Sequence, residues 1–187
     1  MIKIFIDQGH NPSGFNAGAE GNGLREQDIT YQVGVYLAGL LNADPRFEAR
    51  LSRNSPDEVL GTNNSTSLQA RVRAANSWPV DYFISIHANA STIESASGSE
   101  GFAYSEASQG YPMGENILYW LNQTTGLQNR GMNVRPSLWV LRKTRMPAVL
   151  IELGFITNAG DANLMANDPN AFATGIYNGI LAYYGLL

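Results

Sequence analysis

The sequence predicts an α/β domain of three layers, in which a mostly parallel, twisted sheet of about six strands is flanked by helices on both faces. Segments with the two-residue alternation of a strand take turns along the chain with segments whose apolar residues recur at helical spacing. Residues 81–87 (DYFISIH) are almost continuously apolar, as expected of a central parallel strand covered on both faces. The length of 187 residues fits a single domain over residues 1–187.

The first half of the chain is expected to hold three strands and two helices. Ile2, Ile4 and Ile6 recur at every second position, which is the period of a strand. A loop rich in glycine and asparagine follows over residues 10–23, and residues 24–41 then carry apolar side chains at helical spacing. The same patterns predict a strand near residues 47–52, a helix over 67–78 and the apolar strand 81–87.

The second half continues the alternation and contains no internal repeat or linker. A short strand is expected over residues 98–104 and a helix over 110–124. Two strands are predicted next, at 137–143 (SLWVLRK) and 147–155 (PAVLIELGF), with Pro147 at the start of the second, where its missing N–H costs least. A helix over residues 170–184, with one apolar face, closes the chain.

Composition excludes several classes of function. Twelve Lys and Arg residues against sixteen Asp and Glu residues give a net charge of −4 without a basic block, which argues against nucleic-acid binding. The absence of cysteine excludes disulfides, thiolate zinc sites and a cysteine nucleophile. No apolar run approaches the ~18–20 residues of a membrane span, so we expect no membrane insertion.

The only two histidines of the chain are predicted to lie at the same rim of the sheet. His10 comes just after the first strand and His87 ends the apolar strand, and parallel strands bring their carboxyl ends together. Two such histidines suit a metal site. The alternative is that each histidine only caps its strand through a hydrogen bond.

Glu26 begins the first helix and lies on its inward stripe, three and seven residues before Ile29 and Val33. A carboxylate in that position needs a partner, since burying it unpaired costs several kcal/mol. It can serve as an acid favoured by the helix dipole, as the partner of Arg25 or Arg71 in a salt bridge, or as a third metal ligand.

Glu152 interrupts the apolar strand AVLIELGF, and carboxylates are almost never fully buried without a partner. One explanation is an ion pair with Arg142 or Arg145. The other is an acid or base in a partly apolar pocket beside a metal, where desolvation raises a carboxyl pKa toward the range useful for proton transfer. Two histidines and one glutamate would give Zn²⁺ three protein ligands and an open position, the arrangement of catalytic zinc sites.

The same stretches resemble a known family, the zinc-dependent N-acetylmuramoyl-L-alanine amidases of the amidase 3 type, found in bacterial cell-wall hydrolases, autolysins and phage endolysins. The matching segments span almost the whole chain in the order of the family: IDQGHN, GNGLREQDI, SLQARVRAAN, DYFISIHANA, SLWVLRKTRMPAVLIELGFITN and the closing helix. The segments SIHANA and MPAVLIELGFITN are the specific ones, whereas a lone GH would not be.

The resemblance implies one Zn²⁺ per chain, bound by His10, Glu26 and His87, with Glu152 as the catalytic acid and base. It implies hydrolysis of the amide between N-acetylmuramic acid and L-alanine in peptidoglycan. Zinc would then activate a water molecule and polarise the carbonyl. Asn89 and Arg142 are candidates for contacting glycan or stem peptide, or are ordinary loop and surface residues.

The chain departs from the family around His10. Where the family usually has a proline and then paired glycines around the histidine, this chain has Gln8, Asn11 and Pro12. We expect this departure to alter the backbone of the loop and the substrate preference, while the ligand stays in place.

Two rivals remain beside the amidase, namely a zinc peptidase acting on the stem peptide and a catalytically silent peptidoglycan-binding module. A nucleotide-binding domain is disfavoured, because no GxGxxG or GxxxxGK[ST] motif follows the first strand.

We expect a monomer that acts on the cell wall, without a separate cell-wall-binding domain. The first strand begins at Ile2 and leaves no room for a signal peptide. Such a protein would reach the cell wall by release of the kind that phages use, by non-classical export, or with a signal peptide that has been trimmed from this chain.

Overall fold

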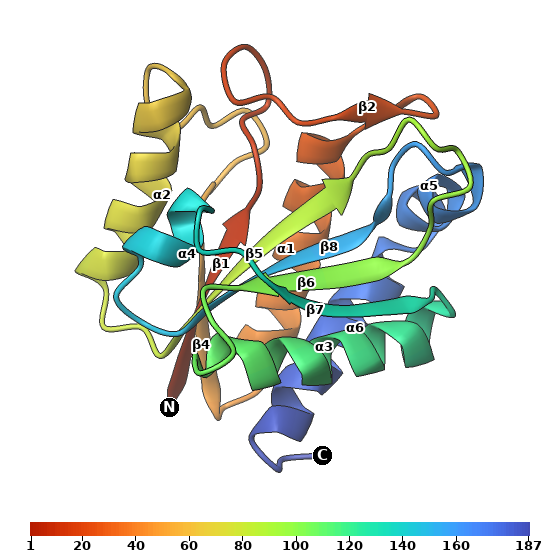
Figure 1. Cartoon of the computed structure of the whole chain (residues 1–187). Helices are drawn as coiled ribbons and strands as arrows, with labels where there is room; N and C mark the ends of the chain where they lie inside the picture. Colours follow the sequence, from red (N-terminus) through yellow and green to blue (C-terminus); the bar gives the residue numbers. More distant parts are fainter.

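A computed structural model describes residues 1–187 and contains one six-stranded sheet with the strand order β4-β1-β5-β8-β6-β7 (Figure 1). The strands of this sheet are β1 (Ile2–Gln8), β4 (Phe47–Leu51), β5 (Tyr82–Asn89), β6 (Ser99–Ala103), β7 (Asn129–Val134) and β8 (Ala148–Phe155). The helices are α1 (Glu26–Ala43), α2 (Asn64–Ser77), α3 (Gly110–Thr125), α4 (Trp139–Lys143), α5 (Ala159–Asn167) and α6 (Pro169–Tyr183). None of these helices is both long and apolar enough to cross a membrane.

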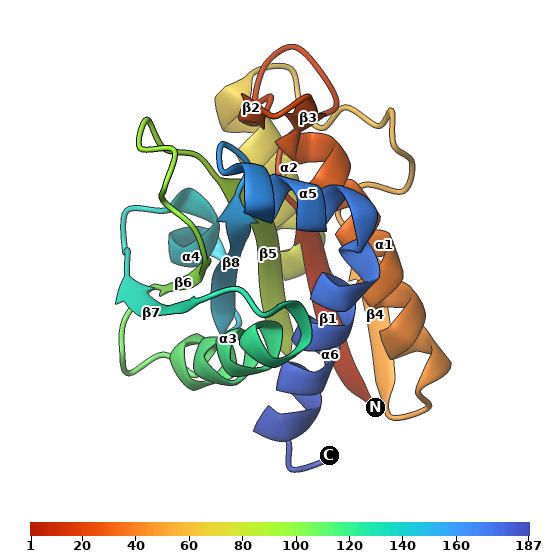
Figure 2. The same cartoon turned by 90° about the vertical axis from the view of Figure 1, so that its right-hand side faces the viewer.

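Helices lie on both faces of the sheet, which confirms the predicted three-layer architecture (Figure 2). The larger core joins one face of the sheet to α1, α3 and α6, and contains Ile84, Ile151 and Leu37, none of which is accessible to solvent. The smaller core joins the other face to α2 and α4, and contains Phe83, Leu150 and Val140. Successive residues of β5 and β8 therefore point into different cores, as the period of a strand requires.

The directions of the strands bring the carboxyl ends of four of them to one edge of the sheet. Strands β4, β1, β5 and β8 are parallel, so their carboxyl ends meet at the same edge of the sheet. Strand β6 runs antiparallel to β8, and β7 runs parallel to β6. The sheet is therefore mostly parallel, as predicted. Both chain termini lie at the end of the molecule opposite this rim (Figures 1 and 2).

The structure corrects one predicted strand. Residues 139–143 form the short helix α4 instead of a strand. Val140 and Leu141 are neighbours in the sequence and are both buried in the smaller core, which a helical turn allows and an extended strand would not. The backbone N–H of Arg142 donates to the carbonyl of Leu138, which closes the turn.

Four elements have no counterpart in the prediction. Strand β7 takes the sixth place in the sheet, but it is an edge strand whose side chains are largely exposed, so its sequence NRGMNV lacks an apolar alternation. Strands β2 (Glu20–Gly21) and β3 (Leu24–Arg25) form a small antiparallel hairpin within and just after the predicted loop. Helix α5 is short and follows β8 directly, where Asn158 caps it.

Candidate metal centre and active site

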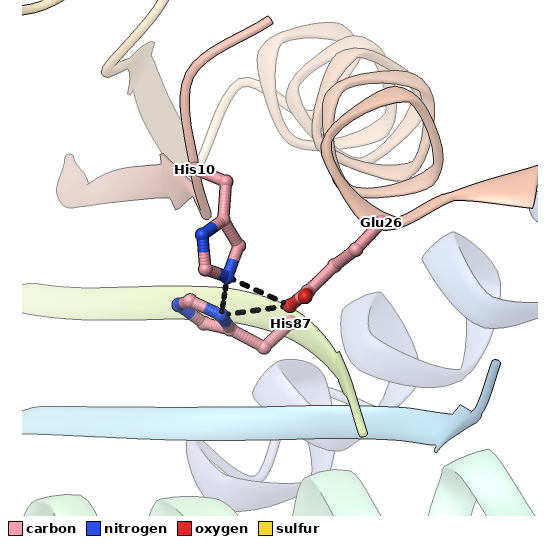
Figure 3. Close-up of side chains that lie close together, drawn as sticks. All are labelled: His10, Glu26 and His87. Carbon is pink, nitrogen blue, oxygen red and sulfur yellow. Dashed lines mark hydrogen bonds and ion pairs between the residues drawn. The ribbon is translucent and has the colours of Figure 1, made fainter. Parts of the chain in front are cut away.

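Three side chains from separate elements converge at the rim (Figure 3). His10 lies two residues after the end of β1, Glu26 is the first residue of α1, and His87 lies near the end of β5. His10 Nε2 and His87 Nδ1 are 3.2 Å apart, and both are close to Glu26 Oε1, at 3.1 and 3.0 Å respectively. The predicted convergence of these residues is therefore present in the structure.

The separations between these donor atoms fit a zinc ion. Tetrahedral ligands at about 2.0–2.1 Å from zinc lie about 3.3 Å from one another, close to the 3.0–3.2 Å found here. Two imidazole nitrogens and a carboxylate oxygen are also the donor types that zinc prefers. The side chains of His10 and His87 are 21% and 19% exposed, which leaves one side of the centre open to solvent. The group can therefore hold a metal ion and still admit water or substrate.

Glu26 is held by the backbone as well as by the histidines. Its Oε1 accepts a hydrogen bond from the N–H of Ala88 at 3.0 Å, and its Oε2 accepts one from the N–H of Ala19 at 2.9 Å. Burial alone would raise the pKa of Glu26, but the hydrogen bonds with His10 and His87 hold that pKa well below its usual range. The carboxylate is thus fixed in its ionised form, which is the form that binds a cation.

The loop that carries His10 has an unusual backbone. His10 has a φ of 68°, in the left-handed region that costs a residue with a side chain about 1–3 kcal/mol. Gly9 precedes it because a Cβ at that position would lie 2.6 Å from Cε1 of His87. The carbonyl of Asn16 contacts Nδ1 of His10 at 3.2 Å, which orients the ring so that Nε2 faces the centre.

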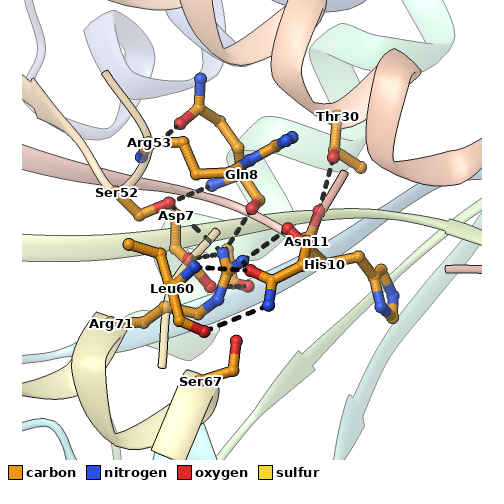
Figure 4. Close-up of polar contacts among 12 residues, drawn as sticks. Asp7, Gln8, His10, Asn11, Thr30, Ser52, Arg53, Leu60, Ser67 and Arg71 are labelled. Carbon is orange, nitrogen blue, oxygen red and sulfur yellow. Dashed lines mark hydrogen bonds and ion pairs between the residues drawn. The ribbon is translucent and has the colours of Figure 1, made fainter. Parts of the chain in front are cut away.

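A buried polar network behind this loop holds it in place (Figure 4). The guanidinium of Arg71, on α2, donates to the carbonyls of Gln8 and His10, both at 2.5 Å, and to Asp7 Oδ1 at 2.7 Å. Burial alone would raise the pKa of Asp7, but the charge of Arg71 and its hydrogen bond lower it below its usual range. The loop conformation is thereby tied to a neutralised, fully buried ion pair.

Gln8 and Asn11, two of the residues that depart from the family pattern, are completely buried in this network. The Gln8 side chain accepts from the N–H of Arg53 at 2.9 Å, while Asn11 both donates to and accepts from the backbone of Leu60. Neither side chain is accessible from the surface. Any influence on substrate passes through the shape of the loop.

Glu152 lies beside the histidine–glutamate group. It is the register partner of His87 across the parallel β5–β8 pair, and of Glu100 across the antiparallel β8–β6 pair. Its Oε2 is fully buried and has no hydrogen-bond partner. Burial raises the pKa of Glu152 to about 7, so the carboxyl group can both accept and release a proton near neutral pH.

Glu26 is the first residue of α1, as the helix-dipole role requires, but the ion pairs considered for the two glutamates do not occur. Arg71 pairs with Asp7 and Arg25 pairs with Asp28, so neither arginine neutralises Glu26. Glu152 forms no ion pair with Arg142 or Arg145.

The two residues predicted to contact substrate lie in different places. Asn89 lines a groove next to Glu152 and donates to Glu100 at 2.5 Å. Arg142 lies over the ring of Trp139 and lines a separate hollow with Tyr104 and Gln109.

Sequence reasoning missed the residues that support the ligands. Asn16 and Ser67 bond to each other at 3.0 Å, and Arg71 bonds to the carbonyl of His10. One signal was available, because Asp7 interrupts an apolar strand much as Glu152 does and so also required a partner. Its partner could not be identified, since Arg71 lies sixty-four positions away.

The fold and the site together define a hydrolase-like α/β domain with a metal-type centre and an adjacent carboxyl group. Residues 4–182 match the family model described as N-acetylmuramoyl-L-alanine amidase. The chain therefore belongs to the N-acetylmuramoyl-L-alanine amidases, a family of peptidoglycan hydrolases.

Relatives and solved structures agree with this membership. The chain is 37% identical over 197 residues to N-acetylmuramoyl-L-alanine amidase CwlM of Bacillus licheniformis, covering 100% of this chain and 70% of that protein. It is 34% identical to the amidase LytC of Bacillus subtilis, covering 97% of this chain and 35% of that protein. The catalytic domain of the amidase CwlV from Bacillus (Paenibacillus) polymyxa var. colistinus has a TM-score of 0.86 and 28% identity, with both chains covered completely.

Proposed function

We propose that this chain is a zinc-dependent enzyme that cuts the amide between the lactyl group of N-acetylmuramic acid and L-alanine in peptidoglycan. His10, Glu26 and His87 hold the zinc ion, and Glu152 transfers the proton. The observation that carries the proposal is the convergence of three metal-type donor atoms beside a buried carboxyl group whose Oε2 has no partner. Family membership supplies the substrate.

Zinc, when bound, supplies Lewis-acid polarisation of the scissile carbonyl and activation of the attacking water. Glu152 accepts a proton from that water at its carboxylate and donates it to the nitrogen of L-alanine as the carbon–nitrogen bond breaks. The carboxylate is thereby restored at the end of the reaction. A pKa raised by burial suits both halves of this exchange, because neither the acid nor the base form is strongly favoured near neutral pH.

The fixed contacts of the site contribute orientation. Ala88 and Ala19 hold the two oxygens of Glu26, while Asn16 holds the ring of His10, so the donor atoms need little rearrangement on metal binding. The exposed side of the two histidines is the direction from which the muramoyl amide approaches.

The first test separates metal binding from proton transfer. Glu152→Gln should retain about one zinc per chain, because the ligand set is intact, and should lose hydrolysis by at least about 100-fold, the lower range for a general acid or base. His10→Ala should lose both zinc and activity. Zinc content is measured by elemental analysis and activity by release of soluble fragments from purified cell walls. Glu115→Gln, on the exposed face of α3, is the matched control.

The second test identifies the bond. An amidase exposes the α-amino group of L-alanine, whereas a peptidase acting on the stem peptide exposes another amine, and mass spectrometry of the digest distinguishes them. Binding to cell walls without release of product would instead support the silent binding module. A Glu152→Gln variant with near wild-type activity would refute the assignment of proton transfer.

A further inference from the structure

A polar groove of about 430 Å³ begins at Glu152 and runs away from the histidines. It is lined by side chains from β5, β6, β8 and from the end of β7, including Asn89, Glu100, Asn133 and Arg135. Across the sheet, the strand order places β1 and β5, which carry the histidines, on one side of β8. Strands β6 and β7 lie on the other side, so the groove is the continuation of the active site in that direction.

Arg135 is the only cation among the residues that line this groove. Its guanidinium lies over the ring of Phe102, 5.0 Å from the ring centre, and makes no hydrogen bond or ion pair within the chain. Phe102 thus restrains the side chain, while the donor N–H groups of the guanidinium remain available. A restrained arginine with unused donors suits the recognition of a carboxylate.

The two carboxyl groups of the groove do not neutralise Arg135. Glu100 accepts the side-chain N–H of Asn89 at 2.5 Å, and Glu152 has a partly buried carboxyl group committed to proton transfer in the proposed function. The groove therefore presents acceptor oxygens near the reacting bond and a positive charge further along. A ligand that fits the groove has amide N–H groups near Glu152 and an anionic group near Arg135.

We propose that Arg135 binds the carboxylate nearest the cut bond on the stem peptide, and so selects substrates by that charge. The inference rests on the proposed function, in which Glu152 gives its proton to the nitrogen of L-alanine. That nitrogen then lies on the Glu152 side of the centre, and the peptide that leaves with it enters the groove. The residue after L-alanine is a γ-linked D-glutamate, whose α-carboxyl group is free in some peptidoglycans and amidated in others.

The dimensions agree with this placement. Strands β8 and β7 are separated by β6, so they lie about 9–10 Å apart at the usual strand spacing, and the register places the backbone of Arg135 about four positions, or about 13 Å, further along the strands than Glu152. The Arg135 guanidinium is closer than its backbone, because it lies over Phe102, which pairs with Leu150, two positions or about 7 Å along β8 from Glu152. One L-alanine residue spans about 3.5 Å, so the carboxylate of the next residue can bridge a separation of this size. The first anionic group beyond the cut bond therefore falls within reach of Arg135, whereas the muramoyl sugar lies on the opposite side of the centre.

The experiment compares two soluble glycopeptides that carry L-alanyl-γ-D-glutamyl-L-lysine and differ only in whether the α-carboxyl group of glutamate is free or amidated. The wild-type zinc enzyme should have a higher kcat/KM for the free acid. Arg135→Gln should lower kcat/KM for the acid by about tenfold or more, mainly through KM, as expected for loss of a charge-assisted hydrogen bond, and should leave the amide nearly unchanged. Arg135→Lys should recover part of the preference.

Arg130→Gln is the matched control, because Arg130 lies on β7, the edge strand that Arg135 follows, but donates to the carbonyl of Ser97 outside the groove. An equal fall in kcat on both substrates would mean that Arg135 acts only through Glu152 and would overturn the inference. So would equal wild-type kcat/KM values on the acid and the amide, with the proposed amidase activity still standing. If neither glycopeptide nor whole peptidoglycan is cut at the muramoyl amide, both proposals fail.

Discussion

The backbone of His10 shows how a single residue can be held in a costly conformation for a chemical purpose. Its left-handed φ would be unfavourable in a free loop. The carbonyl of His10 is instead bound by Arg71, and the next side chain, Asn11, is bonded to the backbone at Leu60. The side chain of His10 is therefore already oriented for its proposed role as a ligand, and such orientation lowers the cost of binding a metal.

Asn11→Ala should weaken both the loop and the metal site. The substitution removes hydrogen bonds to Phe15 and Leu60 and leaves buried backbone groups without partners, so we expect a loss of about 1–3 kcal/mol in the free energy of unfolding. Zinc affinity should fall about 10–100-fold, the range for residues that support a ligand. Urea unfolding of the zinc-free protein and competition with a chromogenic chelator measure the two effects.

Asn167→Ala, at the exposed end of α5, is the control and should change neither quantity appreciably. Unchanged zinc affinity in Asn11→Ala, despite lower stability, would show that the loop does not position His10.

The convergence of the three candidate ligand residues was predictable because each stands at a position with a simple geometric meaning. Strand ends locate His10 and His87 at one rim, and the inward stripe of α1 locates Glu26. The network around Arg71 was not predictable, because its bonds join residues that are far apart in the sequence and mostly involve backbone carbonyls. Arg135 was equally hidden, since it follows an edge strand without a recognisable pattern.

At the scale of elements, α3 and α6 pack unusually closely on one face of the sheet. Gly179 lies against the backbone of Ile117, and a Cβ added there would overlap the Ile117 Cα and N atoms. A Cβ added at Gly175 would lie 2.5 Å from the hydroxyl of Thr124 and 3.0 Å from the Cα of Leu121. These two glycines, four residues apart on one side of α6, let the helix axes approach where larger residues would hold them apart.

Gly179→Ala should therefore destabilise the fold, by about 1–3 kcal/mol, because the obstructing atoms belong to backbone and cannot move aside cheaply. Gly39→Ala provides an internal comparison, since Gly39 lies on the exposed face of α1 with nothing within 4 Å of the added Cβ. That variant should gain about 0.5–1 kcal/mol from helix propensity. Urea unfolding measures the free energy of unfolding of both variants. Equal stability of the two variants would contradict the close contact between Gly179 and the backbone of Ile117.

The elements that prediction placed correctly share a strong burial pattern. Strands β5 and β8 are almost continuously apolar, β1 has isoleucines at every second position, and helices α1 and α6 bury apolar residues at helical spacing. Prediction from apolar patterns fails where an element is mostly exposed or very short. Strand β7 is largely exposed, and α4 places apolar residues at consecutive positions that suit a strand as well as one turn of helix.

At the scale of the whole molecule, ionised carboxyl groups make stability depend on acidity. Hydrogen bonds from Arg46 lower the pKa of Asp44, which also accepts the hydroxyl of Tyr177 at 2.8 Å, and the pKa of Asp7 is likewise below its usual range. A lowered folded-state pKa contributes stability above the unfolded-state value of about 3.9 and loses it as the pH falls through the folded-state value.

We therefore expect the free energy of unfolding to fall progressively below about pH 4. Urea unfolding of the zinc-free protein at a series of values between pH 7 and pH 3 measures the dependence without interference from metal loss. Asp44→Asn should be less stable than the wild type at pH 7 and should lose less on acidification, because one of the contributing carboxyl groups is gone. Parallel curves for the two proteins would contradict the role of Asp44.

The positions of the two termini have a practical meaning for such an enzyme. Both ends of the chain lie at the end of the molecule opposite the rim where β1 and β5 end (Figures 1 and 2). The candidate active site and the two chain termini therefore lie at opposite ends of the domain. Whatever is joined to either end, an affinity tag or a second module, trails behind while the rim meets a polymer too large to enter any closed cavity.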